Sequence, residues 1–306
     1  MDMAVGVVWI IRDAKPGHFS QCEGLTNALL EIVPGLRVET LHRLPLAQLL
    51  KTLLTRHLPP EIESLRDKGT PDLLIAAGHA THFTLLVLGW LLGAKTLLLM
   101  KPSLPCQLFD LCLIPAHDQP AEADNIICTQ GALNPMRPGI KKSGQGVILI
   151  GGPSKHHRWD DHRLMQQLEG ITQSSAIHWT LTTSRRTPAS THSRIGALKA
   201  VELIPFESTA PGWVAEQLAG AEYVWVTEDS VSMIYEALTA GCAVGILNVP
   251  RVADKPNRLV RGLSALVEQG QVRIYSDTDD LSLQHPAQVF NEAQRCAQMI
   301  IDRGWL

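Results

Sequence analysis

The chain has 306 residues, of which 45% are hydrophobic and 19% charged, and its formal net charge at pH 7 is −3. At roughly 150 residues per domain, this length predicts about two domains, and the composition is typical of a folded globular protein. Charges of both signs are scattered along the chain. This scatter excludes an acidic or basic tail, and the slightly negative net charge argues against a nucleic-acid-binding protein, which usually carries a basic excess.

Targeting and membrane-spanning segments are also not expected. The first residues contain no basic start and no small-residue cleavage site, so they do not resemble a secretory signal. The longest apolar stretch, residues 83–94, is shorter than the roughly 20 residues of a spanning helix. None of the six cysteines forms a CxxC pair, and we expect reduced, packed thiols in a cytoplasmic protein. The Leu-rich segment 83–92 is a candidate for peripheral membrane contact.

Short apolar runs alternate with helical patterns in the first half of the chain. Helices are expected over residues 18–32 and 81–92, the latter buried, with two more starting near Leu46 and Pro59. Continuous apolar runs bounded by glycine and proline are typical of a parallel sheet covered on both faces. The predicted strands are residues 5–11, 36–41, 72–76, 95–99 and 108–114.

The second half repeats the alternation. Its predicted strands are residues 147–150, 176–182, 201–204, 223–227, 243–247 and 272–275. Its predicted helices are residues 158–168, 213–218, 230–240, 257–268 and 288–303, the last with an apolar stripe at Val289, Ala293, Cys296 and Ile300. Alternating strands and helices predict an α/β protein with doubly wound parallel sheets.

The best linker is the Gly- and Pro-rich segment 131–146. We therefore expect an N-terminal Rossmann-like domain at residues 1–138 and a C-terminal one at residues 139–306. The closing helix is a candidate to pack back on the first domain.

Ligands of open parallel sheets bind at the carboxyl ends of the strands. After the first strand come Asp13, Lys15, Gly17 and His18. Gly17 lets the backbone approach a ligand, and the following helix N-terminus favours an anion. An ordinary Pro–Gly turn capped by His18 is an equal alternative.

The loop after residues 147–150 contains Gly151, Gly152 and Ser154. Their amides and hydroxyl suit a phosphate, although neither a P-loop nor GxGxxG is present. The nearby polar cluster suggests a metal site, but HExxH is absent and adjacent histidines diverge on any regular element. We favour a solvated helix start and predict no metal site for this cluster, His156, His157, Asp160, Asp161 and His162.

Two further strand ends in the second half carry polar residues. Ser184, Arg185 and Arg186 follow residues 176–182 and fit phosphate oxygens, or equally a capped helix start with solvated arginines.

The predicted strand at residues 223–227 is followed by Asp229 or Ser230 as a helix cap, and then by Ser232 and Met233. Ser232 and Glu236 share a helix face. This arrangement suits a diphosphate at the helix N-terminus and two vicinal sugar hydroxyls on Glu236. A well-capped helix with an exposed glutamate is the alternative.

Strand-end histidines in the first half are candidate general bases near neutral pH. Gly78, His79 and His82 follow one strand, and His117 with Asp118 follows another. Structural roles for these histidines are an alternative. No GxSxG motif and no Cys–His context supports a hydrolase.

Five segments in this order resemble the mitochondrial-fission (elongated-mitochondria) protein family, which has bacterial members of about this length. They are RDAKPGHFSQCEGL, FDLCLIPAHD, LIGGPSKHHRW, LTTSRRTP and VTEDSVSMIYEA. That family is similar to GT-B glycosyltransferases and UDP-N-acetylglucosamine epimerases. The resemblance implies two Rossmann-like domains of parallel sheet with a cleft between them.

The resemblance also implies site residues. In the GT-B fold the second domain holds the nucleotide diphosphate, and the matching positions are Asp229, Ser230, Val231, Ser232 and Glu236, with Gly151, Gly152 and Ser154 in the first loop. Further donor-binding candidates are Lys15, Gly17, Ser184, Arg185, Arg186 and Met233. The base of inverting members comes from the first domain, and His18, His117 and Asp118 are the candidates. Asp229 departs from the usual glycine or serine, although the epimerases tolerate an Asp–Ser pair there.

The function so implied is glycosyl transfer from a nucleoside diphosphate sugar of uridine type to an unknown acceptor, with no metal or other cofactor required. Sugar epimerisation is the close alternative. Plant members recruit a dynamin-related protein to the mitochondrial surface, so a non-catalytic adaptor with a protein partner at a membrane surface is the third reading.

Overall fold

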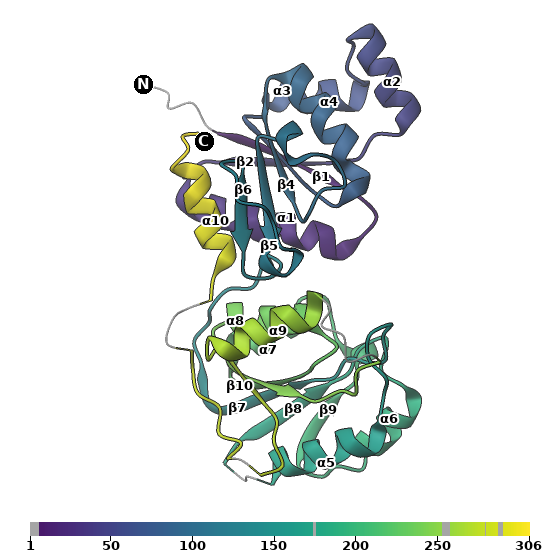
Figure 1. Ribbon diagram of the computed structural model, residues 1–306, viewed down its shortest axis with the longest axis vertical. Coiled ribbons are helices and arrows are strands. Elements are labelled where there is room, and N and C mark those ends of the chain that lie inside the picture. Colours follow the sequence, from purple (N-terminus) through teal and green to yellow (C-terminus); the bar gives the residue numbers. More distant parts are fainter. Residues whose placement is uncertain (1–5, 174–175, 253–257, 279, 287–289) are drawn as a thin grey trace. The chain divides into compact units, whose positions relative to one another are not determined.

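The computed structural model describes residues 6–173, 176–252, 258–278, 280–286 and 290–306. The chain divides into two compact units, which are described separately. Unit 1 comprises Met1–Pro135 and Asn291–Leu306, and unit 2 comprises Met136–Phe290. Each unit contains a parallel sheet with helices on both faces (Figure 1), so the predicted α/β class with two parallel sheets is confirmed.

The sheet of unit 1 has the strand order β2-β1-β3-β4-β5-β6, and every neighbouring pair is parallel. Its strands are β1 Val7–Arg12, β2 Arg37–His42, β3 Leu73–Ala77, β4 Lys95–Leu99, β5 Leu111–Pro115 and β6 Ile126–Thr129. Its helices are α1 Pro16–Ile32, α2 Leu46–Thr55, α3 Pro60–Lys68, α4 His82–Leu92 and α10 Glu292–Ile301.

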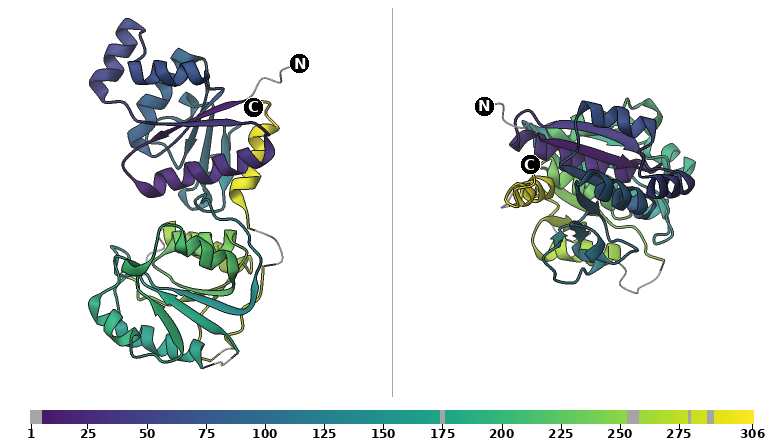
Figure 2. Two further views of the ribbon diagram at one scale, coloured as in Figure 1. Left: turned by 180° about the vertical axis from the view of Figure 1, so that it is seen from behind. Right: turned by 90° about the horizontal axis from the view of Figure 1, so that it is seen from above.

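Side chains on successive residues of β1 enter two different cores. Val8 and Ile10 pack under α1 and α10, while Trp9 and Ile11 face α2, α3 and α4. This two-sided burial explains why the strand reads as a continuous apolar run. Figure 2 shows α10 beside α1, although the two helices come from opposite ends of the chain.

The sheet of unit 2 has the order β12-β11-β10-β7-β8-β9 and is also parallel throughout. Helices α7, α8 and α9 cover one core, and α5 and α6 the other. The strands are β7 Lys142–Leu149, β8 His178–Thr182, β9 Val201–Ile204, β10 Ala221–Thr227, β11 Ala243–Leu247 and β12 Val272–Ile274. The helices are α5 Asp161–Thr172, α6 Ala189–Ile195, α7 Trp213–Gly220, α8 Val231–Thr239 and α9 Arg258–Glu268.

The predicted linker at residues 131–146 is partly wrong. Its last residues, from Lys142, form the first half of β7 and pair with β10. Gly146 is needed there because the ring of Trp179 packs against it, where a Cβ would overlap the ring. Gly146, which the sequence placed in a linker, is therefore a close-packing position within a strand.

Several predicted elements also change in extent. Residues 106–108 form a 3₁₀ turn rather than the start of a strand, and the closing helix begins at Glu292. The helix predicted at 81–92 exists as α4, but it is not fully buried, since Phe83 and Trp90 are exposed. The predicted positions Val5, Asn257 and Val289 lie outside the described residues.

Across the part of the chain that the structure describes, no helix is long and apolar enough to cross a membrane. All six cysteines are free, and Cys22, Cys112, Cys242 and Cys296 are buried. Burial raises the thiol pKa of each of these four, which disfavours the reactive thiolate.

Candidate functional site

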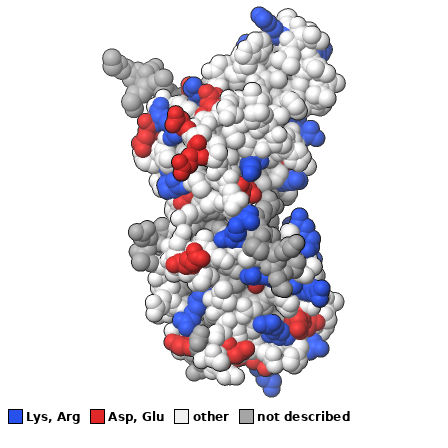
Figure 3. Space-filling model, in the orientation of Figure 1, with Lys and Arg blue, Asp and Glu red and all other residues white. Residues whose placement is uncertain are grey.

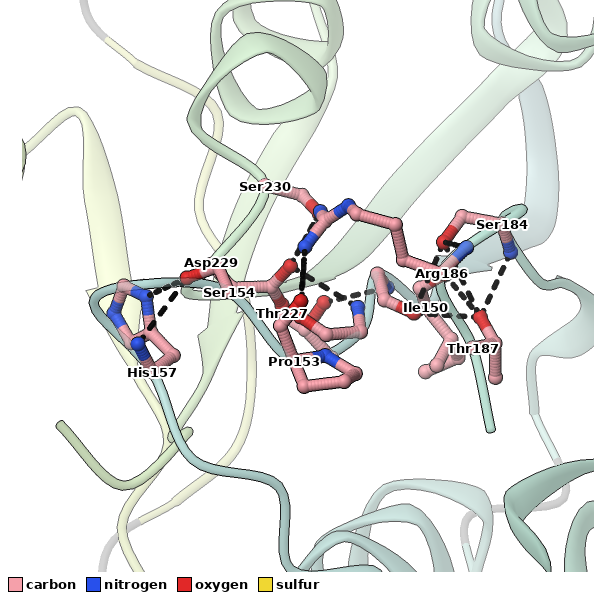
Figure 4. Close-up of polar contacts among 12 residues, drawn as sticks. Ile150, Pro153, Ser154, His157, Ser184, Arg186, Thr187, Thr227, Asp229 and Ser230 are labelled. Carbon is pink, nitrogen blue, oxygen red and sulfur yellow. Dashed lines mark hydrogen bonds and ion pairs between the residues drawn. The ribbon is translucent and has the colours of Figure 1, made fainter. Parts of the chain in front are cut away.

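The loops that follow β7, β8 and β10 meet at one edge of the unit 2 sheet (Figure 4). The Gly151 amide donates to Oγ1 of Thr227 at 2.8 Å, and the Gly152 amide donates to Oδ2 of Asp229 at 3.1 Å. Both amides therefore already have acceptors within the protein, in place of the phosphate that the sequence suggested for them.

These two glycines permit a close approach of the three loops. A Cβ on Gly151 would overlap the side chains of Asp229 and Ser230, and one on Gly152 would overlap the backbone of Arg186. The glycine pair thus brings the acidic turn after β10 against the loop after β7.

Arg186, in the loop after β8, forms hydrogen bonds with the loops after β7 and β10. Its Nη2 donates to Oδ2 of Asp229 at 2.6 Å and to Oγ of Ser230 at 3.1 Å, while Nη1 donates to the Gly152 carbonyl at 2.7 Å. The Asp229 side chain is fully buried and that of Arg186 is 43% exposed. The guanidinium therefore neutralises this buried carboxylate, and it still presents part of its charge to solvent.

Ser184 and Thr187 position the loop that carries Arg186. Oγ of Ser184 donates to the Gly151 carbonyl at 3.0 Å, and the Ser184 amide donates to Oγ1 of Thr187 at 2.9 Å. Arg185 points elsewhere, with its guanidinium 5.3 Å from the ring centre of Phe206. The loop is therefore an ordered turn that separates the two arginines.

The histidine-rich segment differs from the solvated helix start that we predicted. Oγ of Ser154 accepts the amide of His157 at 3.1 Å, and His157 itself is buried. Its Nε2 lies 3.8 Å from Oε1 of Glu228, which Arg251 Nη2 also approaches to 2.5 Å. Burial acts to raise the pKa of Glu228, but the contacts with His157 and Arg251 outweigh it and hold that pKa below its ordinary value. His157 therefore belongs to a buried polar cluster.

Helix α5 starts later, at Asp161, and Oδ1 of Asp160 accepts the Arg163 amide at 3.1 Å as its cap. Among the described residues, no group of three or more His, Cys, Asp or Glu could hold a metal ion.

The N-terminus of α8 has no side-chain cap. Ser230 occupies the N-cap position, but its hydroxyl donates to the Asp229 carboxylate at 3.0 Å instead of capping the helix. Within the described residues, the amides of Val231, Ser232 and Met233 meet no hydrogen-bond acceptor. The predicted cap is therefore wrong, and three donors at the positive end of a helix dipole remain available.

Glu236 lies one turn further along α8 and is partly buried, so the alternative of an exposed glutamate is wrong. Burial raises the pKa of its carboxyl group from 4.5 to about 7. In the described part of the chain no side chain or amide donates to this carboxylate. A partner-free acid with a raised pKa is typical of a binding site.

In unit 1, His18 is held by Asp13, a pairing that sequence reasoning did not find. Nδ1 of His18 lies 2.8 Å from Oδ2 of Asp13, and Oδ1 of Asp13 accepts the Lys15 amide at 2.9 Å. Burial acts to raise the pKa of Asp13, but these hydrogen bonds prevail and lower it. The ring of His18 packs on Gly78, which has φ +82° and no room for a Cβ. His18 lies within α1 and does not cap it.

The other predicted residues of unit 1 are more dispersed. Lys15 and Gly17 are exposed at the start of α1. His117 and Asp118 form a 3₁₀ turn after β5, with 3.8 Å between Nε2 and Oδ2. His82 is buried against Phe109, and burial lowers its pKa, so it is a core residue.

Solved structures of two enzyme classes share this architecture over nearly the whole chain. MurG of Acinetobacter baumannii is 12% identical, with 97% of this chain and 98% of that chain covered and a TM-score of 0.52. A putative UDP-N-acetylglucosamine 2-epimerase from Listeria monocytogenes is 12% identical, with coverages of 98% and 88% and a TM-score of 0.53. UGT2 of Phytolacca americana, complexed with UDP-2fluoro-glucose and pterostilbene, is also 12% identical, with coverages of 99% and 90% and a TM-score of 0.52. The fold is thus that of GT-B glycosyltransferases and the related epimerases.

The chain belongs to the family described as Mitochondrial fission ELM1, which matches residues 16–304, so the family expected from the sequence is confirmed. The uncharacterized protein RP120 of Rickettsia prowazekii (strain Madrid E) is 24% identical over 349 residues. That match covers 96% of this chain and 97% of the relative.

Proposed function

We propose that unit 2 binds a nucleoside diphosphate sugar of uridine type, and that the protein transfers the sugar to an acceptor hydroxyl without a metal ion. The observation that carries the proposal is the uncapped start of α8 next to Arg186, where three amides meet no acceptor among the described residues. One turn further along, Glu236 meets no donor among the same residues.

In this proposal the diphosphate lies at the N-terminus of α8. The amides of Val231, Ser232 and Met233 supply donors, and the helix dipole favours an anion there. Ser230 already bonds Arg186 at 3.1 Å, so the exposed part of the guanidinium stands next to the same turn. Gly151, Gly152, Ser184 and Ser154 act indirectly, because their contacts shape the loops that carry Arg186 and Asp229.

Glu236 is assigned to the ribose. An ionised carboxylate has two oxygens and can accept one hydrogen bond from each of two vicinal hydroxyls. Since no protein donor meets it among the described residues, the cost of burying its charge is recovered when those hydroxyls bind.

For transfer, the bond from the sugar carbon to the diphosphate oxygen breaks and a bond to the acceptor oxygen forms. The α8 amides and Arg186 stabilise the charge that develops on the leaving diphosphate. His18 is assigned as the base that takes the acceptor proton on Nε2, because Asp13 occupies Nδ1 and orients the ring. His117 and Asp118 are the alternative pair.

Two structures that share the fold support this proposal. The Phytolacca americana enzyme was solved with UDP-2fluoro-glucose, and the Listeria protein is named a putative UDP-N-acetylglucosamine 2-epimerase.

Isothermal titration calorimetry with uridine diphosphate tests the binding step. We expect saturable binding by the wild-type protein and at least about tenfold weaker binding by Glu236→Gln, since charged hydrogen bonds contribute about 1.5–3 kcal/mol. Glu216→Gln, an exposed position on α7, is the matched control and should bind like the wild type. No binding of uridine diphosphate by the wild type contradicts the proposal.

Incubation with a uridine diphosphate sugar alone, followed by NMR of the sugar, separates the two reactions. A changed sugar configuration in the absence of acceptor indicates epimerisation and contradicts transfer.

A further inference from the structure

Helix α2 carries an apolar face that the rest of unit 1 does not cover. Leu46, Leu50, Leu53 and Leu54 are 64%, 53%, 41% and 85% exposed, and their spacing places them on adjacent rows of one helix face. On this helix the buried residues are Leu49 and Thr52. An amphipathic helix in a globular protein normally turns its leucines towards the core. Helix α2 differs, because it has leucines on its exposed side as well as on its buried side.

Helix α4 extends the same surface. Phe83 and Trp90 are 57% and 60% exposed and lie two turns apart on one side of α4, which packs against α2. The guanidinium of Arg56, at the end of α2, lies 5.6 Å from the ring centre of Trp90 and joins the two helices. We call these residues the apolar face of unit 1: Leu46, Leu50, Leu53, Leu54, Phe83 and Trp90.

The charged side chains on and next to α2 in the sequence have one sign. Between residues 43 and 60 the charged side chains are Arg43, Lys51 and Arg56, and the sequence has no acid until Glu61. Helix α4 contributes no acid and no Lys or Arg. In the view of Figure 3, the part of unit 1 formed by α2 shows blue and white atoms without red ones.

We propose that the apolar face of unit 1 docks on a lipid bilayer with anionic headgroups. Exposed leucines with an interfacial tryptophan and flanking cations are the features of a helix that lies in the membrane interface, where apolar side chains enter the acyl region and Lys and Arg meet anionic headgroups. The inference does not depend on nucleotide binding, because all of the residues involved belong to α2 and α4.

A second copy of the chain fits this face less well. In a two-fold contact the same surface meets itself, so Lys51 and Arg56 of one copy would approach the same cations of the other. Like charges brought together in this way cost free energy, whereas an anionic bilayer offers both apolar depth and opposite charge.

The membrane contact that the sequence suggested lay at residues 83–92. The structure shows that half of that segment is buried, including Leu85 and Leu88. The docking residues proposed here lie mainly on α2 instead, and α4 contributes only its two exposed aromatic residues.

Sedimentation of the full-length protein with vesicles tests the proposal. The vesicles contain equal parts of phosphatidylcholine and phosphatidylglycerol, and the reference vesicles contain phosphatidylcholine alone. We expect the wild type to sediment with the anionic vesicles, to bind the neutral ones at least about tenfold more weakly, and to be released by salt because screening weakens the cationic contribution.

Two substitutions and a matched control define which residues bind. Leu50→Ser with Leu54→Ser should reduce binding at least about tenfold, because two exposed leucines lose the transfer into the acyl region. Lys51→Gln with Arg56→Gln should reduce binding to anionic vesicles only. Leu108→Ser, a 52% exposed leucine of unit 1 outside the face, should bind like the wild type. All these positions are exposed, so equal melting temperatures are expected.

Two outcomes overturn the proposal. One is a wild-type protein that stays in the supernatant with both kinds of vesicle, or that binds equally well after the leucines are replaced. The other is a concentration-dependent dimer, detected by light scattering, in a protein that does not bind vesicles. If the leucine substitutions abolish that dimer, the face belongs to a contact with a second copy of the chain.

Discussion

Nδ1 of His18 lies 2.8 Å from Oδ2 of Asp13, and the same imidazole ring packs directly on the backbone of Gly78. The carboxylate fixes which nitrogen carries the proton, and the glycine fixes where the ring lies. Two residues that directly follow strands, Asp13 after β1 and Gly78 after β3, therefore determine the position of the His18 imidazole in α1. This arrangement allows each contribution to be tested separately.

Replacing Gly78 by alanine should displace His18. The new Cβ would overlap the imidazole, and Gly78 has φ +82°, so we expect the free energy of unfolding to fall by about 2–4 kcal/mol. Gly93→Ala is the matched control, because Gly93 has φ +65° but open space around its Cβ. Its free energy of unfolding should fall by only about 1 kcal/mol, the cost of a positive φ for a residue with a Cβ.

The double variant Gly78→Ala with His18→Ala should recover most of the difference between Gly78→Ala and Gly93→Ala, since the overlapping ring is gone. Chemical denaturation of the four proteins measures these values. Equal losses for Gly78→Ala and Gly93→Ala are inconsistent with a ring packed on Gly78.

Glu236→Gln should stabilise the protein at neutral and alkaline pH. The ordinary pKa of this carboxyl group is 4.5 and burial raises it to about 7 in the folded state. The unfolded chain therefore loses its proton first, and stability falls as pH rises through this window. Above about pH 7 the buried charge costs about 3 kcal/mol, a cost that glutamine avoids.

Thermal denaturation of wild type and Glu236→Gln across this pH range checks the expectation. The two curves should converge near pH 4.5 and separate towards pH 7. Separation that is already complete at acidic pH would mean that the glutamate is destabilising for a reason other than its charge.

Nucleotide binding should have the opposite dependence on pH. Since ribose hydroxyls bond the ionised carboxylate most strongly, affinity for uridine diphosphate should rise as pH rises through about 7, where Glu236 ionises. Calorimetry at several pH values measures this, and Glu236→Gln should remove that rise. A wild-type affinity that is flat across pH 7 argues against the ribose assignment.

The Arg186–Asp229 pair should show strong coupling in a double-mutant cycle. Among the described residues, Arg186→Met leaves the fully buried carboxylate with the Gly152 amide and the Ser230 hydroxyl as its donors, and we expect a loss of about 2–3 kcal/mol. The solvent exposure of the arginine keeps this loss below that of a fully buried pair. Adding Asp229→Asn should cost less than the sum of the single changes, as measured by urea denaturation.

Glu292→Ala should loosen the docking of α10 on unit 1. Oε2 of Glu292 accepts the Gln130 amide at 2.8 Å and Nη2 of Arg295 at 2.7 Å, and both donors lose this acceptor in the variant. We expect a loss of about 1–3 kcal/mol and faster hydrogen exchange in α10. Glu63→Ala on the exposed side of α3 is the control and should leave exchange in α10 unchanged.

Much of the fold was predictable because buried parallel strands have a clear signature. Residues 95–99, 201–204 and 243–247 were predicted as strands with the bounds that β4, β9 and β11 have. Strand β6 and helix α6 were missed. β6 has only four residues, of which two are buried, and α6 is a short run rich in serine and threonine with two buried residues. Neither carries the apolar periodicity on which such predictions depend.

For the site, the sequence predicts which loops come together but not which side chains pair. Parallel strands bring their carboxyl ends to one edge, so the grouping of Gly151, Arg186 and Ser230 follows from the strand positions. The side-chain pairings do not, because they depend on the direction of each side chain in an irregular turn. Asp13 with His18 and Glu228 with Arg251 lie 5 and 23 residues apart in sequence, with no periodicity to indicate them.

The return of α10 to unit 1 has a consequence for the order in which the protein can fold. Cys296, Ala297 and Ile300 complete the same core as Val8 and Leu25, yet the ribosome makes them after all of unit 2. Unit 2, by contrast, is one continuous segment, Met136–Phe290. During synthesis, unit 2 can therefore close its core before unit 1 does, and unit 1 depends on two segments that flank unit 2 in the sequence meeting after all of unit 2 has been made.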